Sequence, residues 1–515
     1  MRRALAGLRR GQAAPGVVAL GVAMVLAVAY LLAPPLGTDL SAQFARADFF
    51  AAHGWTPIDL RWYGGINQFG YSLVSSALMG TFGVPAVAVA SLLVSSAAFA
   101  YLLTRHNAVR PALGAVAGAF CVAGNLASGR VTYALGIMFG LLALAALSSR
   151  TRAAAALAGL FALLASASSP VAGLFTGLAG VAVFFTVSRL SGAVLAVSAA
   201  VPMIFTGVLF GEGGTMNMSV KDAAGAAIAS IAVLASCRFP VLRLGAALSA
   251  AGVLAAYALP TPVGLNATRL ATMFAIPVLV AFAPLRSPGR TPVAPGWLRA
   301  EFALLVGALA VAAPPVVLAD LGDAGNPASR REYFTPLTTE LTRLGATRIE
   351  VVPTRDYWES AYVAPLARGW LRQLDVQRNP IMYEKLPGGE KLTSDNYRAW
   401  LRGNAVSHVA LPDAELSWLA KPEAELIRSG LPYLTEVWRG EHWRLYAVAD
   451  PSPIVDGYVS SDDTSVTFDA AGPGEHLVRI RYSPFLTMPG GSLAPGSDGW
   501  TAAKTPARGR YKISS

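Results

Sequence analysis

The chain has 515 residues, of which 54% are hydrophobic and 14% charged, and its mean hydropathy is +0.49. This balance excludes an ordinary water-soluble globular protein and indicates that lipid is one of its solvents. The formal net charge is +11, but the basic residues stand in ones and twos between apolar runs, so nucleic acid is not a predicted partner. Cys121 and Cys237 lie at or inside apolar segments and indicate neither a disulfide framework nor a thiolate metal site.

The N-terminus is a basic segment followed by an apolar run over residues 17–36. A run of about 20 residues is long enough to cross a hydrocarbon layer about 30 Å thick. Because many further apolar runs follow, we interpret this one as a membrane anchor and not as a signal peptide that is removed.

A long connection with its own predicted helix follows the first apolar run. Thr38 can cap this helix, Asp39 lies in its first turn, and Gly54 can end it. Asp39, Gln43 and Arg46 recur on one face. We therefore expect an amphipathic helix in the membrane interface, whose polar face looks into a cavity or into water.

Beyond Gly54 the same connection is rich in aromatic and small residues. Asp59 and Arg61 are neighbouring opposite charges, Tyr63 suits the level of the lipid headgroups, and a Gly-Gly pair lets the backbone approach another group closely. This segment is predicted to form a binding rim.

Ten more apolar segments follow, which gives about eleven membrane-spanning helices. They cover approximately residues 83–104, 111–128, 131–148, 153–168, 170–187, 191–210, 223–237, 243–259, 269–285 and 301–319.

Charge is distributed unevenly over the connections between these segments. The side of the N-terminus receives fourteen basic and no acidic residues: Arg2, Arg3, Arg9, Arg10, Arg105, Arg110, Arg150, Arg152, Arg189, Arg238, Arg243, Arg286, Arg290 and Arg299. The other side, before residue 301, receives five basic residues and every acidic one: Arg46, Arg61, Arg130, Lys221, Arg269, Asp39, Asp48, Asp59, Glu212 and Asp222. The positive-inside rule then predicts a multi-pass protein of the bacterial plasma (inner) membrane with a cytosolic N-terminus and an extracytoplasmic C-terminal region.

An acidic residue just after the first span, in a long outer loop with an interfacial helix, resembles the arrangement of the C-type (GT-C) membrane glycosyltransferases. The resemblance implies transfer of a sugar from a polyprenyl-phosphate donor to a cell-envelope glycan or lipid acceptor outside the cytosol, with Asp39 as the catalytic carboxylate. Acidic residues are often paired there in that family. Here the partner is Asp48, nine residues on, as an auxiliary or metal-binding residue, which leaves a requirement for a divalent cation open.

Two basic residues stand at outer helix ends, Arg130 in NLASGRVTYALG and Arg269 in GLNATRLATMFAIP. Each opens an apolar segment with a helix N-terminus that points outward, which suits a phosphate through the guanidinium and the backbone dipole. We predict that both bind the donor phosphate, and a snorkelling or interfacial anchor or a structural partner of Asp39 or Asp48 is the alternative. The predicted acceptor site or rim comprises Gln43, Arg46, Asp59, Arg61, Tyr63, Asn125 and Asn266.

The layout also resembles uncharacterised membrane proteins of high-GC bacteria that are often labelled as transporters. No ionisable residue lies in the middle of a predicted span, which weighs against a proton-coupled transporter. A transporter or a lipid or glycan flippase of the same topology is the alternative function, and a non-catalytic scaffold for envelope assembly is a third.

After residue 320 the composition changes, and charged and aromatic residues become frequent. The predicted domains are a transmembrane domain over 1–320 with an outer loop over 37–70, an extracytoplasmic α/β domain over 321–451, and a small β-sandwich over 452–515.

Overall fold

The computed structural model describes residues 2–149, 151–283, 315–386 and 388–515, with side chains from residue 14 onward. It divides into two compact units, which are described separately below. Unit 1 consists of Met1–Gly37, Tyr71–Leu209 and Thr215–Ala324. Unit 2 consists of Thr38–Gly70, Phe210–Gly214 and Gly325–Ser515. The residues that follow the first helix thus belong to the same unit as the C-terminal residues. The predicted domain boundaries at residues 320 and 451 place them in a different domain.

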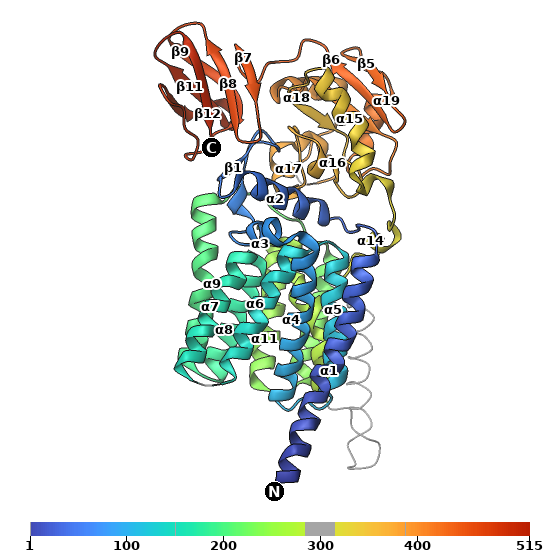
Figure 1. Ribbon diagram of the computed structural model, residues 1–515, viewed down its shortest axis with the longest axis vertical. Coiled ribbons are helices and arrows are strands. Elements are labelled where there is room, and N and C mark those ends of the chain that lie inside the picture. Colours follow the sequence, from blue (N-terminus) through green and yellow to red (C-terminus); the bar gives the residue numbers. More distant parts are fainter. Residues whose placement is uncertain (1, 150, 284–314, 387) are drawn as a thin grey trace. The chain divides into compact units, whose positions relative to one another are not determined.

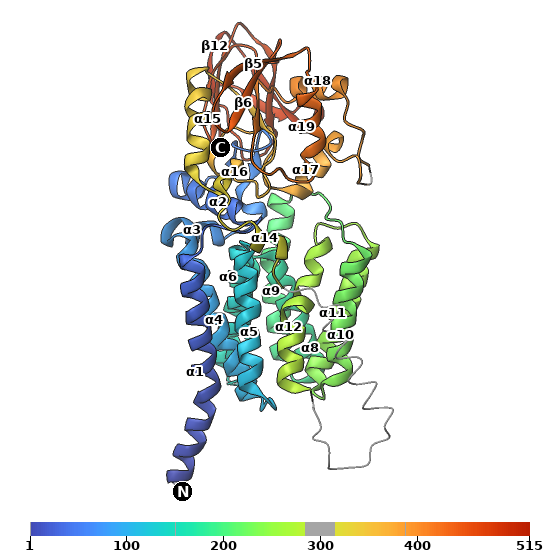
Figure 2. The same ribbon diagram turned by 90° about the vertical axis from the view of Figure 1, so that its right-hand side faces the viewer.

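Unit 1 is built of helices, which Figures 1 and 2 show from two directions. They are α1 (Arg2–Leu32), α3 (Ser75–Phe82), α4 (Val84–Arg105), α5 (Pro111–Ala127), α6 (Val131–Leu147), α7 (Arg152–Ser168), α8 (Pro170–Thr186), α9 (Arg189–Phe210), α10 (Val220–Ser236), α11 (Pro240–Ala258), the 3-10 turn η2 (Gly264–Thr268), α12 (Arg269–Phe282) and α14 (Leu318–Gly322). Helix α6 packs against α7 and α4, α10 packs against α11, and α1 packs against α5.

Five stretches of these helices are long and apolar enough to cross a membrane: Ala14–Leu32, Val84–Arg105, Arg189–Phe210, Pro240–Ala258 and Gly264–Phe282. Four further apolar helices, α5 to α8, have 17 residues each. The protein is therefore a membrane protein, because helices of this length and composition are stable in lipid, where every backbone polar group must be satisfied within the segment.

The first ten predicted apolar segments each coincide with a helix, and their ends differ by a few residues except at α1, which begins fifteen residues earlier, at Arg2. The eleventh, over residues 301–319, lies mostly outside the described residues. The predicted number of about eleven spans is therefore not established.

Small residues allow the helices of unit 1 to approach closely. A β-carbon added at Gly136 of α6 would lie 2.6 Å from the β-carbon of Ala172 in α8, and one added at Gly180 of α8 would lie 2.6 Å from the backbone nitrogen of Ala196 in α9. Such contacts replace the hydrophobic effect as the source of helix association in lipid.

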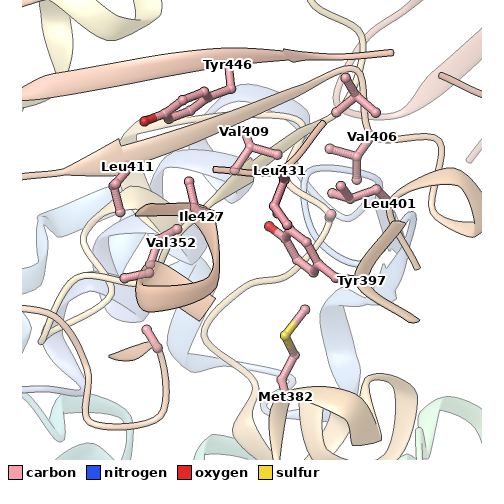
Figure 3. Packing of buried hydrophobic residues seen from close by; sticks show 14 of the residues in the cluster. Val352, Met382, Tyr397, Leu401, Val406, Val409, Leu411, Ile427, Leu431 and Tyr446 are labelled. Carbon is pink, nitrogen blue, oxygen red and sulfur yellow. The ribbon is translucent and has the colours of Figure 1, made fainter. Parts of the chain in front are cut away.

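The first part of unit 2 is a four-stranded sheet in the order β3-β4-β6-β5 with helices around it. Its elements are β3 (Ile349–Val351), β4 (His408–Pro412), β5 (Leu434–Arg439), β6 (Trp443–Val448), α15 (Arg331–Arg343), α16 (Glu359–Tyr362), α17 (Arg372–Arg378), α18 (Ser394–Gly403) and α19 (Lys421–Arg428). Strands β3 and β4 are parallel and the other pairs antiparallel. Figure 3 shows the core, in which Tyr397 and Leu401 of α18 pack with Val409 and Leu411 of β4.

The last part of unit 2 contains two antiparallel three-stranded sheets, β10-β11-β9 and β12-β8-β7. The strands are β7 (Tyr458–Ser461), β8 (Ser465–Ala470), β9 (Gly474–Arg481), β10 (Ser492–Pro495), β11 (Trp500–Thr505) and β12 (Gly509–Ser514). Phe468, Val478 and Ile513 belong to one core that also includes Ile58 and Leu60 from the N-terminal segment of this unit. In β8 buried residues alternate with more exposed ones, which is typical of a half-buried strand.

Four buried charges are concentrated in the α/β part of unit 2. The Arg368 guanidinium forms ion pairs with Glu350 and Glu423, and it lies 4.0 Å from a carboxylate oxygen of Asp375. The Tyr397 hydroxyl donates to Glu423 over 2.8 Å. Burial raises the pKa of Glu350, and the positive charge of Arg368 opposes this rise. Three carboxylates therefore depend on one cation.

Replacing Arg368 with Met is expected to destabilise unit 2 by about 3–5 kcal/mol, because it leaves buried carboxylates without their counter-charge. The apparent thermal midpoint of the purified full chain, followed by tryptophan fluorescence in detergent, should fall by about 10 °C. Arg439→Gln removes an arginine from an exposed pair with Glu436 and should leave the midpoint unchanged. Equal midpoints for all three proteins would contradict this assignment.

Candidate functional site

Helix α2 runs from Leu40 to His53 and begins directly after the predicted catalytic carboxylate. Asp39 occupies the N-cap position, which corrects the prediction that Thr38 is the cap, and the Asp39 side chain makes no capping hydrogen bond. Gly54 ends the helix as predicted, with φ 60° and its N–H donating to the carbonyl of Phe50. The half-buried carboxylate of Asp39 is thus not used to cap its own helix.

Asp39 lies next to a segment more than 300 residues further along the chain. The Trp370 indole donates to the carbonyl of Thr38 over 2.9 Å. Burial disfavours the charge of Arg372, but Tyr357, with which it is hydrogen-bonded, and the carboxylate of Asp39 raise the pKa of this guanidinium. We call Asp39, Tyr357, Trp370 and Arg372 the Asp39 cluster.

Tyr357 holds a strained backbone conformation in this cluster, with φ 58°. Its side chain is buried, and its hydroxyl lies 3.0 Å from the hydroxyl of Ser417. A left-handed conformation costs a bulky residue of the order of 1–3 kcal/mol and is found mostly where the surroundings demand it, often at functional sites.

The predicted polar face of α2 does not look into water. Gln43 is completely buried and donates to the carbonyl of Asp39 over 3.1 Å. Arg46 is also buried, and its guanidinium lies over the ring of Trp370 at 5.4 Å from the centroid. Rim residues would need exposed side chains, so Gln43 instead holds the start of α2 through Asp39, and Arg46 packs on Trp370.

The side chains of Asp48 and Asp39 do not lie on the same side of α2. Nine residues correspond to two and a half helical turns, so the two positions lie on opposite sides of the helix. Asp48 is exposed and lies 3.7 Å from Arg331, so its predicted auxiliary role stays a prediction without a contact to Asp39 that supports it. Among the described residues, no group of three or more His, Cys, Asp and Glu side chains could hold a metal ion.

The predicted rim residues Asp59, Arg61 and Tyr63 are buried, and this corrects their assignment to a rim. Arg61 forms an ion pair of 2.8 Å with Asp59 and donates to the carbonyl of Ala45 over 2.7 Å. The Tyr63 hydroxyl donates to the carbonyl of Gly369 over 2.6 Å. These side chains fasten the N-terminal segment of unit 2 to α2 and to the residues before Trp370.

Helix α16 packs against α2 and carries the buried carboxyl of Glu359. Burial raises the pKa of this carboxyl from 4.5 to about 7, although the Thr354 hydroxyl donates to it over 2.6 Å. The folded state therefore holds a proton that the unfolded chain loses above pH 4.5. The stabilising contribution is complete below pH 4.5 and is lost as the pH rises through about 7.

Replacing Glu359 with Gln should remove this pH dependence, because an amide can still accept the hydrogen bond from Thr354. We expect the variant and the wild type to share one thermal midpoint at pH 4.5, and the variant to melt several degrees higher at pH 8. Thermal unfolding of both proteins at the two pH values measures this. If the difference in thermal midpoint between variant and wild type were the same at pH 4.5 and at pH 8, Glu359 would not titrate in this range.

In unit 1 the two arginines that are predicted to bind phosphate both lie near the side chain of Tyr133. Arg130 is the N-cap of α6, and Arg269 is the first residue of α12. The Arg269 guanidinium lies over the ring of Tyr133, 5.1 Å from its centroid, and the charges of Arg130 and Arg269 both act on the Tyr133 hydroxyl. Tyr133 is only 2% exposed, and its hydroxyl has no hydrogen-bond partner among the described residues.

The asparagines that precede these arginines are also buried. Asn125 is 2% exposed, and its amide nitrogen has no hydrogen-bond partner in the described part of the chain. The amide nitrogen of Asn266, in η2, donates to the sulfur of Met216 over 3.3 Å. Neither forms an exposed rim. Two guanidinium groups at helix starts near one hydroxyl are groups that can hold an anion.

No family model and no curated protein matches the sequence. Two solved structures similar to this one are cryo-EM structures of the arabinofuranosyltransferase AftD from mycobacteria, the second in a mutant form. Both are structures of a glycosyltransferase. The first is 16% identical with a TM-score of 0.45 and covers 90% of this chain and 41% of that chain. The second, also 16% identical with a TM-score of 0.45, covers 92% and 43%. This chain therefore spans less than half the length of the AftD chains.

The sequence did not identify Tyr133, Tyr357 or Arg372 as site residues. Tyr133 follows Arg130 by three residues, so helical spacing places both on neighbouring positions of α6, and this signal could have identified it. Arg372 and Tyr357 carry no such signal, because their proximity to Asp39 depends on how unit 2 folds.

Proposed function

We propose that the protein is a membrane glycosyltransferase that transfers a sugar from a polyprenyl-phosphate donor to a cell-envelope glycan or lipid acceptor on the outer face of the plasma membrane. The observation that carries this proposal is the pair Arg130 and Arg269 at two helix N-termini around the buried Tyr133 hydroxyl. A lipid-linked phosphate needs a binding site at the ends of apolar helices, and this pair supplies the positive charge there.

In the proposed reaction, an acceptor hydroxyl forms a bond to the anomeric carbon as the bond from that carbon to the phosphate oxygen breaks. The hydroxyl proton passes to Asp39, and the electron pair of the broken bond leaves with the polyprenyl phosphate. This single displacement inverts the anomeric configuration. Arg130 and Arg269 stabilise the charge that grows on the leaving phosphate, as preorganised donors do in other transfer reactions.

Asp39 is the proposed base because it is a half-buried carboxylate at the N-cap position of α2, next to the guanidinium of Arg372. The uneven distribution of charge over the connections supports an outer location for Asp39 and for the helix ends that carry both arginines.

The proposal can be tested with the purified full chain in lipid nanodiscs, labelled pentosyl and hexosyl polyprenyl phosphates, and fragments of envelope glycans or lipids as acceptors. We expect sugar transfer together with the release of one polyprenyl phosphate per sugar. If folded protein transfers no sugar but moves the donor lipid across proteoliposome membranes, the flippase alternative replaces this proposal.

A further inference from the structure

Unit 2 contains a polar cleft that none of the assignments above uses. Its volume is about 610 Å³, within the range of small-molecule sites. The residues around it include Gln377 and Arg378 of α17, Arg481 at the end of β9, and Asp498 in the turn before β11. Glu212 also lines it, and this residue belongs to unit 2 although it lies far away in the sequence.

The charged side chains of the cleft are fixed by other contacts. Arg378 forms an ion pair of 3.0 Å with Glu212 and donates to the carbonyl of Gly65 over 3.1 Å. The Arg481 guanidinium stacks on the ring of Trp500 at 3.8 Å from the centroid and donates to the carbonyl of Asp498 over 2.5 Å. Polar groups that are held in place before binding lose little entropy when a ligand arrives.

Arg481 forms part of the wall of the cleft. Its Nε atom is buried and has no hydrogen-bond partner within the described residues. Burial and the nearby charge of Arg378 lower the pKa of Arg481 to about 10. The guanidinium of Arg481 as a whole is only half-buried, so its accessible N–H groups can donate to an acceptor atom in the cleft.

The balance of charge in the cleft indicates which ligand it suits. Two arginines face two carboxylates, Glu212 and Asp498, so the lining has no net charge. An anion would meet both carboxylates, and an apolar ligand would offer no hydrogen-bonding group to these four charged side chains. A hydroxyl both donates and accepts hydrogen bonds, so a polyhydroxylated neutral molecule can satisfy the arginines and the carboxylates together.

The cleft is joined to the segment that follows α2. The N–H of Arg481 donates to the carbonyl of Gly64 over 2.8 Å, and Arg378 donates to that of Gly65. A β-carbon at Gly64, where φ is +71°, would lie 2.9 Å from the Trp500 ring. Glycine is needed at this position because of its conformation and its close neighbour. The same segment carries Arg61, which is bonded to α2, so a connected set of contacts within unit 2 leads from the cleft to the helix that begins after Asp39.

We propose that this cleft is a binding site for a neutral saccharide. That the saccharide is the acceptor glycan rests on the proposed function, whereas its binding does not. Glu212 and Asp498 accept hydrogen bonds from sugar hydroxyls, Arg378 and Arg481 donate to them, and Gln377 and Tyr482 complete the contacts.

The experiment measures binding of neutral oligosaccharides to the full chain in nanodiscs by saturation-transfer-difference NMR and calorimetry. The probes are di- to tetrasaccharides of arabinose, mannose, galactose and glucose, and glucuronate and inorganic phosphate are the anionic comparison. We expect at least one neutral probe to bind, with a Kd about tenfold weaker in Gln377→Ala and in Tyr482→Phe, since each removes hydrogen bonds at the cleft. Gln373→Ala, one turn earlier on the same helix and outside the cleft, should bind like the wild type.

Asp39→Asn is included because it separates this proposal from the proposed function. Saccharide binding that persists in Asp39→Asn supports the cleft whether or not the wild type transfers sugar. Three results would each overturn the proposal: no binding of any neutral probe, binding that neither cleft variant weakens, or tighter binding of phosphate or glucuronate than of every neutral sugar.

Discussion

Replacing Asp39 with Asn is expected to lower the rate of sugar transfer by about 10²- to 10⁴-fold, the usual contribution of a general base. The amide keeps the size of the side chain but cannot take the acceptor proton. Because Asp39 makes no capping hydrogen bond, α2 should keep its stability. The measurement is kcat for transfer in nanodiscs, together with the thermal midpoint of the same preparation.

The matched control is Asp48→Asn on the same helix. Asp48 is exposed and lies on the opposite side of α2 from Asp39, so its loss should leave kcat unchanged. If Asp39→Asn transfers sugar at the wild-type rate, another group takes the proton, and the assignment of the base is wrong.

Replacing Arg130 or Arg269 with Gln is expected to lower kcat by about 10²- to 10³-fold each, as the loss of one preorganised donor does elsewhere. Arg269→Lys should recover part of this loss, because a lysine keeps the charge but not the planar fork of donors. Tyr133→Phe should have a smaller effect in the same direction, because it removes only the hydroxyl. The measurement is kcat and KM for the polyprenyl-phosphate donor.

Arg105→Gln is the control for these variants. Arg105 ends α4 and donates to the carbonyl of Ser148, so it is an arginine of the same unit without a predicted role in phosphate binding. We expect transfer by this variant to match the wild type. If the Gln variants insert and fold normally and keep the wild-type kcat and KM, both arginines are membrane anchors.

The helices of unit 1 could be predicted because a run of apolar residues carries its own signal. Helix α6 illustrates this, since the prediction over residues 131–148 differs from the observed Val131–Leu147 by one residue. The start of α2 was less predictable, because Thr38 and Asp39 are both good caps and only the surrounding contacts decide between them.

The surroundings of Asp39 could not be predicted from the sequence. The contact of Trp370 with Thr38 joins residues 332 positions apart, and no local pattern indicates such a pair. Gln43 and Arg46 were predicted to lie on a solvent-facing side of the helix because they recur with Asp39 at helical spacing. Periodicity identifies a polar face, but it does not show that a second polar surface covers that face.

The prediction that Arg130 and Arg269 bind phosphate rests on a local pattern of the sequence, and it stays a prediction. Arg130 and Arg269 each follow small residues and begin a helix, and a cation at such a position marks an anion site more specifically than one on an open surface. Their common neighbour Tyr133 could be identified only from the structure, because Arg269 approaches it from another helix.

The residues between Thr38 and Gly70 are built into the core of unit 2. Ile58 and Leu60 complete the core of the β-strands, and the Trp62 indole donates to the carbonyl of Ser360 over 3.0 Å. A protein expressed from Gly325 onward would therefore lack residues 38–70, which contribute to the core of this unit. Anyone who wishes to study this region in solution should supply the N-terminal segment by a linker or as a peptide, so that the apolar surface it covers is not left open to aggregation.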